Sequence, residues 1–330
     1  MSIQVLYIFR KPDAQRHSIE KLFEVIRSVL PKSISHSALN MPYHSNGILA
    51  IIRNMIYARK HKQPINHITG DIHYTAMLLP RSTTLLTIHD AEILNRTSGL
   101  KHLFIKWIWF VLPAMRVKYI TVISEFSAAE LKKHIPRFAH KIKVVHNCIS
   151  SQFTFFPKPF NQEKPVLLHL GTKANKNLMR LIEAVKGMNI SLYIAGELPI
   201  DAKLLLEKNK IDFVNKSFLN LFEIIEWYKL CDVLCFVSTY EGFGLPILEA
   251  QATGRAVITS KAASMPEVAG DGALLVDPYS VEEISKAIVE VINNQTLRES
   301  LIEKGLANAN RFNAHEVARQ YAEIYTSMLK

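Results

Sequence analysis

Short apolar runs alternate with amphipathic stretches along almost the whole chain. Strands are expected in the first half at 3–9, 65–69, 83–89, 119–124 and 141–146. Strands are expected in the second half at 165–171, 191–196, 232–238, 255–260 and 273–277. Helical periodicity predicts helices at 17–30, 127–135, 178–187, about 219–230, 281–293 and 313–330. Apolar strands alternating with amphipathic helices indicate an α/β fold whose parallel sheets are covered on both faces.

A linker divides this pattern into two halves. Residues 151–166 contain three prolines and lose the periodicity, as linkers do. We therefore expect an N-terminal domain at 1–155, a second domain at 165–311 and a C-terminal helix at 312–330. A chain of 330 residues, 48% hydrophobic and 21% charged, has the length and composition of about two globular domains.

The formal net charge of +11 favours anionic partners. No block of basic residues and no zinc-finger signature indicates nucleic acid. The three cysteines (Cys148, Cys231 and Cys235) are too few for a disulfide framework, and a metal pair at Cys231 and Cys235 is a weak alternative to buried thiols. A reducing, cytoplasmic compartment fits best, because neither a signal peptide nor an apolar run of about 20 residues is found.

Polar residues follow most of the predicted strands, and ligands of parallel sheets bind outside these carboxyl ends. Loops alone explain any single one of them, but together they predict a cleft between two domains. In the first half they are Arg10, Lys11, Gly70, Asp71, His73, His89, Asp90, Ser124, Glu125 and Asn147. In the second half they are Thr172, Lys173, Lys176, Gly196, Glu197 and Glu241.

The stretch "TYEGFGLPILEA", residues 239–250, predicts a binding turn. Pro246 suits the first turn of a helix, and Gly242 and Gly244 let the backbone approach a ligand closely. The positive end of the helix favours phosphate. The carboxylates of Glu241 and Glu249 can each accept hydrogen bonds from two hydroxyl groups. The segment could therefore bind hydroxyl groups, a phosphate and further hydroxyl groups in succession, and a ligand with this order of groups is a nucleotide-sugar.

"EGFGLPILEA" resembles the E-x7-E signature of retaining, nucleotide-sugar-dependent glycosyltransferases with the GT-B fold, the group called glycosyltransferase family four or group one. "TIHD", "VISEFSAAEL", "VVHN", "LGTKANKNLMRLIEAV", "VLCFVSTYEGFGLP" and "ASMPEVAGDGALLVDP" resemble the same family in order. The resemblance implies two Rossmann-like parallel-sheet domains facing a central cleft, with the last helix packing back across the first domain.

The resemblance also implies residue roles. The donor would be held by Gly171, Thr172, Lys173, Lys176, Glu241, Gly242, Phe243, Gly244, Leu245 and Glu249. Glu249 would bind the ribose, Glu241 the transferred sugar and Lys176 the diphosphate, while His89 would face the reacting sugar. His89, Glu241 and Lys176 are the expected catalytic residues.

The sequence departs from the family pattern in three places. Thr172 stands where an arginine is usual, and Lys173 is a substitute without the arginine fork. The Gly-rich loop after the first strand is replaced by "FRKPDAQRHSIE", so Arg10 or Ser18 could serve the acceptor, together with Asp71, His73 and Asp90. "HNCI" replaces the common Asn-Gly.

The expected reaction moves a hexosyl group to a hydroxyl of a glycan or lipid-linked glycan with retained configuration. The leaving phosphate would help to deprotonate the acceptor. No Asp-x-Asp motif occurs, so catalysis without a metal or other cofactor is expected.

Two histidine motifs leave alternatives open. "HITGDIH" could hold a metal through His67, Asp71 and His73, but an acceptor-side or structural role is favoured. His169 is expected to be a hydrogen-bonded core histidine.

The basic, aromatic segment 99–119 predicts either a helix on an anionic membrane or a core helix with a basic edge. A cytoplasmic protein attached peripherally to the inner membrane face would fit the first alternative.

Two other functions compete with the transferase. An NAD-dependent oxidoreductase is disfavoured because no G-x-G-x-x-G follows the first strand. A nucleotide-sugar-binding regulator or non-catalytic partner stays open, because Thr172 departs from the family pattern.

Overall fold

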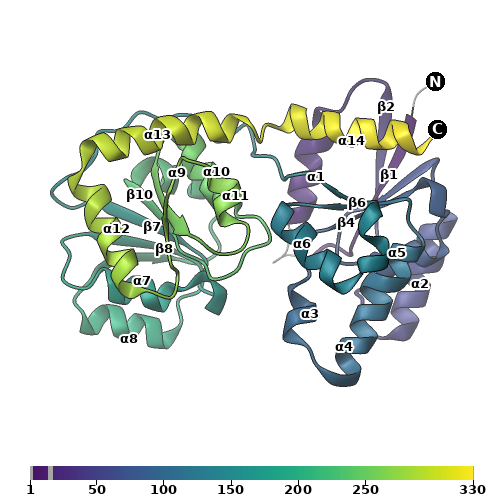
Figure 1. Cartoon of the computed structure of the whole chain (residues 1–330), viewed down its shortest axis with the longest axis horizontal. Helices are drawn as coiled ribbons and strands as arrows, with labels where there is room; N and C mark the ends of the chain where they lie inside the picture. Colours follow the sequence, from purple (N-terminus) through teal and green to yellow (C-terminus); the bar gives the residue numbers. More distant parts are fainter. Residues whose placement is uncertain (1–2, 14–17, 330) are drawn as a thin grey trace. The chain divides into compact units, whose positions relative to one another are not determined.

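The computed structural model describes residues 3–13 and 18–329. The chain forms two compact units (Figure 1). Unit 1 comprises Met1–Cys148 and Ala314–Lys330, and unit 2 comprises Ile149–Asn313. Each unit contains a six-stranded sheet in which all pairs of neighbouring strands are parallel. The predicted α/β class with two parallel-sheet domains is confirmed.

The sheet of unit 1 has the strand order β2-β1-β3-β4-β5-β6. Its strands are β1 (Ile3–Phe9), β2 (Ile34–Asn40), β3 (Ile65–Ile68), β4 (Thr84–Ile88), β5 (Tyr119–Val122) and β6 (Ile142–Val144). Its helices are α1 (Ser18–Ser28), α2 (Ile48–Lys60), η1 (His73–Leu78), η2 (Arg81–Thr83), α3 (Glu92–Arg96), α4 (Gly99–Ile105), η3 (Lys106–Val111), α5 (Leu112–Met115), α6 (Glu125–His134), η4 (Pro136–Lys141) and α14 (Ala314–Met328).

Alternate residues of β1 supply the two cores of unit 1. Val5, Tyr7 and Phe9 pack with α1 and α14 on one face of the sheet. Leu6 and Ile8 pack with the other helices on the opposite face. This alternation follows from the two-residue period of a strand, and it brings the last helix of the chain against the first strand.

The sheet of unit 2 has the strand order β12-β11-β10-β7-β8-β9. Its strands are β7 (Val166–Leu170), β8 (Ser191–Ala195), β9 (Asp212–Lys216), β10 (Val233–Phe236), β11 (Ala256–Ser260) and β12 (Leu274–Val276). Its helices are η5 (Ala174–Lys176), α7 (Leu178–Ala184), α8 (Ile200–Lys208), α9 (Leu221–Leu230), α10 (Leu245–Thr253), α11 (Met265–Ala269), α12 (Val281–Asn293) and α13 (Gln295–Asn310).

Two predicted helices differ in detail from the structure. Helix α6 begins at Glu125, before the predicted start at 127, because Ser124 caps it: its Oγ accepts a hydrogen bond from the Ser127 amide. The segment 99–119 is helical from Gly99 to Met115, but a π-helical stretch, η3, separates α4 from α5.

Candidate functional site

Two loops of unit 2 meet at the carboxyl edge of its sheet. β7 and β10 are neighbouring parallel strands, with Leu167 opposite Val233. The segments that follow them, 171–176 and 237–244, therefore lie at the same edge. Both segments belong to the predicted donor site, and the structure brings them together.

Each of these loops contains a glycine whose backbone has a positive φ, a conformation that favours glycine. Gly171 has φ +89°, and a Cβ there would lie 3.0 Å from Cγ and Cε of Lys176. Gly244 has φ +113° and caps α10, with Pro246 in the first turn as predicted. The two turns let the Lys176 side chain and the start of α10 lie close to the carboxyl edge of the sheet.

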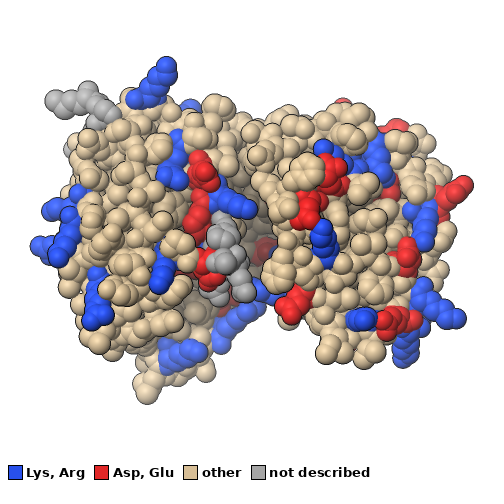
Figure 2. Space-filling model, turned by 180° about the vertical axis from the view of Figure 1, so that it is seen from behind, with Lys and Arg blue, Asp and Glu red and all other residues tan. Residues whose placement is uncertain are grey.

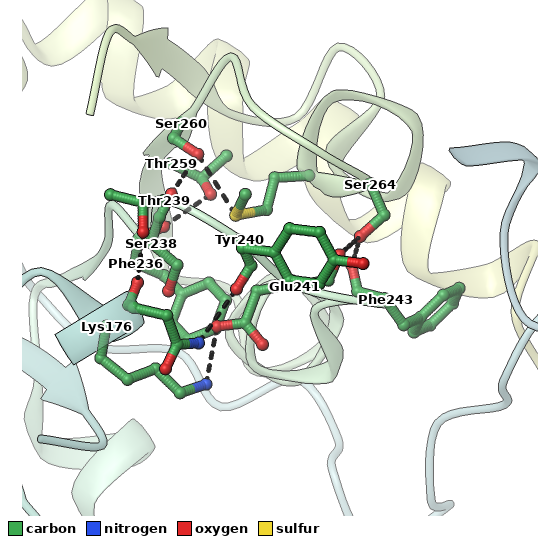
Figure 3. Close-up of polar contacts among 12 residues, drawn as sticks. Lys176, Phe236, Ser238, Thr239, Tyr240, Glu241, Phe243, Thr259, Ser260 and Ser264 are labelled. Atoms are coloured by element: carbon green, nitrogen blue, oxygen red, sulfur yellow. Dashed lines mark hydrogen bonds and ion pairs between the residues drawn. The ribbon is translucent and has the colours of Figure 1, made fainter. Parts of the chain in front are cut away.

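An ion pair joins the two loops. Lys176 Nζ lies 2.8 Å from Oε1 of Glu241, and both side chains are largely buried, at 21% and 15% exposure (Figure 3). The ammonium group also lies 4.8 Å from the ring centre of Phe236. Two predicted catalytic residues, 65 positions apart, thus form one ion pair.

The backbone around this pair is fixed by hydrogen bonds. The Asn175 side-chain amide donates to the Tyr240 carbonyl at 3.0 Å, and the Thr239 amide donates to the Asn175 carbonyl at 2.8 Å. The Ser264 hydroxyl lies 2.9 and 2.6 Å from the carbonyl oxygens of Glu241 and Phe243 (Figure 3). Sequence reasoning missed Asn175 and Ser264, although both lie in segments already quoted for the family resemblance.

Asn177 is a further residue that the sequence did not identify. Its backbone is left-handed, with φ 66°, and its side-chain amide donates to the carbonyls of Val237 and Pro278 at 2.9 and 2.7 Å. The asparagine therefore holds the lysine loop against both neighbouring loops. Asparagine is one of the few residues that adopt this conformation readily, which is the only sequence signal available.

Glu249 lies in the second turn of α10 and is partly buried. Its Oε2 accepts a 2.7 Å hydrogen bond from the hydroxyl of Tyr228 on α9. Burial raises the pKa of the Glu249 carboxyl to about 7, and the tyrosine hydrogen bond acts in the opposite direction. Nothing in the sequence pointed to Tyr228 as its partner.

The departures at Thr172 and Lys173 have different structural settings. The Thr172 hydroxyl donates to the Glu197 carbonyl at 2.6 Å, next to Gly196, which has φ +128°. Lys173 is exposed and forms no ion pair with any described residue. Thr172 therefore joins two loops, whereas Lys173 has a free charge for a ligand.

In unit 1, His89 follows β4 and is partly buried. Its Nε2 lies 2.9 Å from the Thr69 carbonyl, which can only accept, so this nitrogen carries the proton. Burial is the main cause that lowers the pKa of His89. The neutral ring then offers Nδ1 as an acceptor.

Arg10 lies between two carboxylates at the end of β1. Its guanidinium contacts Glu20 at 3.0 Å and Asp71 at 3.2 Å. Ser18 is the exposed first residue of α1, and Asp90 is exposed after β4. Glu20, which sequence reasoning missed, is thus a direct partner of Arg10.

The histidines of "HITGDIH" form structural contacts. His67 is fully buried, with Nδ1 at 2.7 Å from the Tyr325 hydroxyl and Nε2 at 2.7 Å from the Thr87 hydroxyl. His73 is buried and lies 2.8 Å from the Trp109 carbonyl. These contacts support the structural role that the sequence left open. Within 3–13 and 18–329, no group of three or more His, Cys, Asp or Glu could hold a metal ion.

Three residues that the sequence singled out lie in or beside the sheet of unit 2. Cys231 and Cys235 are buried free thiols. His169 is buried as expected, and burial lowers its pKa to about 4. Its Nδ1 is 3.2 Å from the Cys235 carbonyl, so it is a hydrogen-bonded core histidine as expected, although its Nε2 has no hydrogen-bond partner in the described part of the chain.

Comparison with known proteins finds a family match within unit 2. Residues 150–307 match the model of glycosyl transferases group 1, in agreement with the group-one resemblance of the sequence. A stretch of 98 residues is 39% identical to O-antigen chain mannosyltransferase B of Escherichia coli. That stretch covers 30% of this chain and 26% of the relative, so the chain spans about a quarter of that protein.

Solved structures match over nearly the entire chain. Anabaena Alr3699/HepE in complex with UDP and glucose has a TM-score of 0.79 at 16% identity, covering 98% of this chain and all of that one. WaaG, a glycosyltransferase involved in lipopolysaccharide biosynthesis, has a TM-score of 0.73 at 15% identity with the same coverage. At this identity the similarity shows a shared fold.

Proposed function

From the match of residues 150–307 to the glycosyl transferases group 1 family, we propose that the chain is a retaining hexosyltransferase. It would move a sugar from a nucleoside diphosphate to a hydroxyl of a glycan or lipid-linked glycan. The observation that carries the proposal is the buried pair of Lys176 and Glu241 beside the glycine turn that starts α10. The UDP and glucose bound by the Anabaena protein and the mannosyltransferase relative support this donor class.

The proposed donor site combines a cation, a helix start and carboxylates. Helix α10 begins directly after Gly244, and helix starts favour phosphate. Lys176 supplies positive charge for the diphosphate, while Glu241 keeps its ammonium group in place before the donor arrives. Glu241 would then accept hydroxyls of the sugar, and Glu249 those of the ribose.

The proposed chemistry occurs on one face of the sugar. The bond from the anomeric carbon to the diphosphate oxygen breaks, and the acceptor oxygen forms a bond to the same face. The acceptor proton passes to the leaving phosphate oxygen. Lys176 and the positive end of α10 would stabilise the negative charge as it develops, so the proposal needs no metal. His89 would accept a substrate hydroxyl at Nδ1.

Replacement of Lys176 by alanine tests the proposal. We expect transfer to fall about 10²- to 10³-fold, the loss typical of one electrostatic contact to a developing charge. Lys186→Ala, which removes an exposed lysine on the same unit, is the matched control and should leave activity unchanged. Equal activity of both variants would contradict the assigned role.

A nucleotide-sugar-binding, non-catalytic protein is the second candidate, because Thr172 is tied to the Glu197 carbonyl instead of offering the usual arginine. A panel of nucleoside diphosphates would be tested for binding by thermal shift, and the matching sugars for transfer to lipid-linked acceptors. Binding together with transfer supports the enzyme. Binding without transfer to any acceptor of the panel supports the binder.

We also propose that unit 1 attaches to an anionic membrane through two neighbouring helices. The core face of 99–119 holds Ile105 and Phe110, whereas its outer face exposes large apolar side chains instead of a purely basic edge. These are Leu100, Leu103, Phe104 and Trp107. Helix α2 adds exposed Ile48, Leu49, Ile52 and Ile56. In the described residues, no helix is long and apolar enough to cross a membrane.

Tyr74 connects the two helical segments. Its hydroxyl accepts a 2.9 Å hydrogen bond from Asn54 of α2, and its ring lies 5.4 Å from Trp109 of η3. The two helical segments therefore pack against the same buried tyrosine. Both are cationic: 48–60 contains Arg53, Arg59 and Lys60, 99–119 contains Lys101, Lys106, Arg116 and Lys118, and neither contains Asp or Glu.

The charge is unequally divided between the units. Residues 1–148 carry 21 Lys and Arg against 8 Asp and Glu, whereas 149–313 carry 17 against 19. On the face of unit 1 drawn at the left of Figure 2, Lys and Arg are spread widely and Asp and Glu gather in one small area. Each cation near an anionic bilayer contributes about 1 kcal/mol, so several of them together with the apolar side chains would hold a peripheral protein at the inner membrane face.

A further inference from the structure

Three neighbouring strands of unit 1 are each preceded by a basic residue. Arg81 lies three residues before β4, Lys118 directly precedes β5, and Lys141 directly precedes β6. The strands are parallel and in register, with Leu85 opposite Tyr119 and Ile120 opposite Ile142. The three cations therefore share the amino edge of the sheet, whereas His89 follows the carboxyl end of β4.

These residues line a pocket of about 510 Å³, together with Ser82, Tyr119 and His140. No Asp or Glu of the part of the chain that the structure describes lines it. None of Arg81, Lys118 and Lys141 forms an ion pair within the described ranges. Lys143 adds a fourth cation, with its Nζ 4.1 Å from the ring centre of Tyr119. So many like charges without a carboxylate favour an anionic ligand.

Lys141 is the residue that distinguishes this pocket from ordinary surface lysines. It is only 4% exposed, and its Nζ donates to the carbonyls of Ala114 and Val117 at 2.7 and 2.8 Å. Its other close neighbour is the ring of Phe138, 5.4 Å away. Burial, and then repulsion from Arg81, lower the pKa of Lys141 to about 8. A buried ammonium group with two neutral acceptors gains most from an anion at its remaining N–H.

We propose that this pocket binds a phosphate group, at a site separate from the proposed donor site. Phosphate oxygens match two ammonium groups, a guanidinium and the Ser82 hydroxyl, all of which donate. The volume leaves room for a substituent, so the phosphate could belong to a lipid headgroup or to a soluble phosphorylated molecule. The site would tether or regulate the protein, because it lies at the opposite end of the strands from His89.

Titration calorimetry with inorganic pyrophosphate at low salt tests the proposal on the full chain. We expect Arg81→Gln and Lys118→Gln each to weaken binding about fivefold, the effect of one cation near an anion. Lys132→Gln, an exposed lysine of α6 outside the pocket, is the matched control and should bind as the wild type does. Lys176→Ala separates the two sites. Pyrophosphate binding that survives Lys176→Ala and weakens in the pocket variants supports the proposal, and the reverse pattern overturns it without affecting the proposed transferase.

Two further measurements define the ligand. Affinity should fall as the pH rises from about 7 to about 9, because Lys141 loses its proton near pH 8, and Lys141→Met should remove this fall. If the pH dependence is the same in both proteins, Lys141 does not hold the anion and the proposal fails. Sedimentation with phosphatidylcholine vesicles, with and without phosphatidylglycerol, distinguishes the two sources of the phosphate. Weaker vesicle binding of Arg81→Gln indicates a lipid phosphate. Unchanged vesicle binding together with weaker pyrophosphate binding indicates a soluble phosphorylated molecule.

Discussion

Glu249→Gln should change how the stability of unit 2 depends on pH. The pKa of Glu249 is raised from 4.5 to about 7, mainly by burial. The folded protein therefore holds a proton that the unfolded chain has released between these values. The contribution of this group to the free energy of unfolding is fully present below about pH 4.5 and is lost as the pH rises to about 7. Glutamine keeps the Tyr228 hydrogen bond but cannot ionise, so its stability should not fall in this way.

The size of the effect follows from the two pKa values. Between about pH 5.5 and about pH 8.5 the wild type should lose about 2 kcal/mol relative to Glu249→Gln. For a unit of this size that equals about 4–8 °C in Tm. Thermal unfolding of both proteins at the two pH values measures the difference. Glu290→Gln, which removes an exposed carboxylate from α12, is the matched control and should follow the wild type.

Parallel pH profiles of the wild type and Glu249→Gln would refute the reasoning, because the carboxyl would then titrate alike in the folded and unfolded chains. A difference of opposite sign would mean that the Tyr228 hydrogen bond outweighs burial. The same group also predicts the pH dependence of donor binding. Nucleoside diphosphate affinity should rise up to about tenfold from about pH 6 to about pH 8, as the carboxylate becomes available to the ribose hydroxyls, and it should rise less in Glu249→Gln.

Three other predictions use separate parts of the molecule. Gly171→Ala and Gly187→Ala both force an alanine into a left-handed backbone conformation, which costs about 1–2 kcal/mol of stability, but only Gly171→Ala also places a Cβ against a side chain. Gly171→Ala should therefore be less stable than Gly187→Ala in thermal unfolding, and it should lose transfer activity whereas Gly187→Ala keeps it. Tyr325→Phe should lower stability by about 1–3 kcal/mol in unit 1, because a buried histidine and a buried tyrosine lose a partner, and equal Tm values would contradict this. Ile52→Glu combined with Leu100→Glu should move the protein from anionic vesicles to the supernatant on sedimentation, and unchanged sedimentation would exclude this face as the attachment site.

The sequence predicted most strands but missed β2 and β9. Both are edge strands of their sheets, with polar sequences ISHSALN and DFVNK. An edge strand is solvated along one side, so it lacks the continuous apolar run of a central strand. Helix α2 was missed for the opposite reason: its outer face is apolar as well, so no amphipathic period marks it.

The candidate site divides in the same way between local and long-range information. The glycine turn, Pro246 and the helix start could be predicted because φ preferences and the missing proline N–H act within a few residues. The partners Ser264, Asn177 and Tyr228 could not, because each contacts a loop or helix distant in the chain.

The amino-acid sequence alone determined the α/β class, the two sheets and the residue types of the donor site, since periodicity, turn preferences and charge are local properties of the chain. Only the tertiary structure decided that Lys176 pairs with Glu241, that Glu249 is buried enough to hold a proton near neutral pH, and that Lys141 loses water in a cationic pocket. Pairing and desolvation depend on which segments the sheet order places side by side, and no residue carries that information by itself.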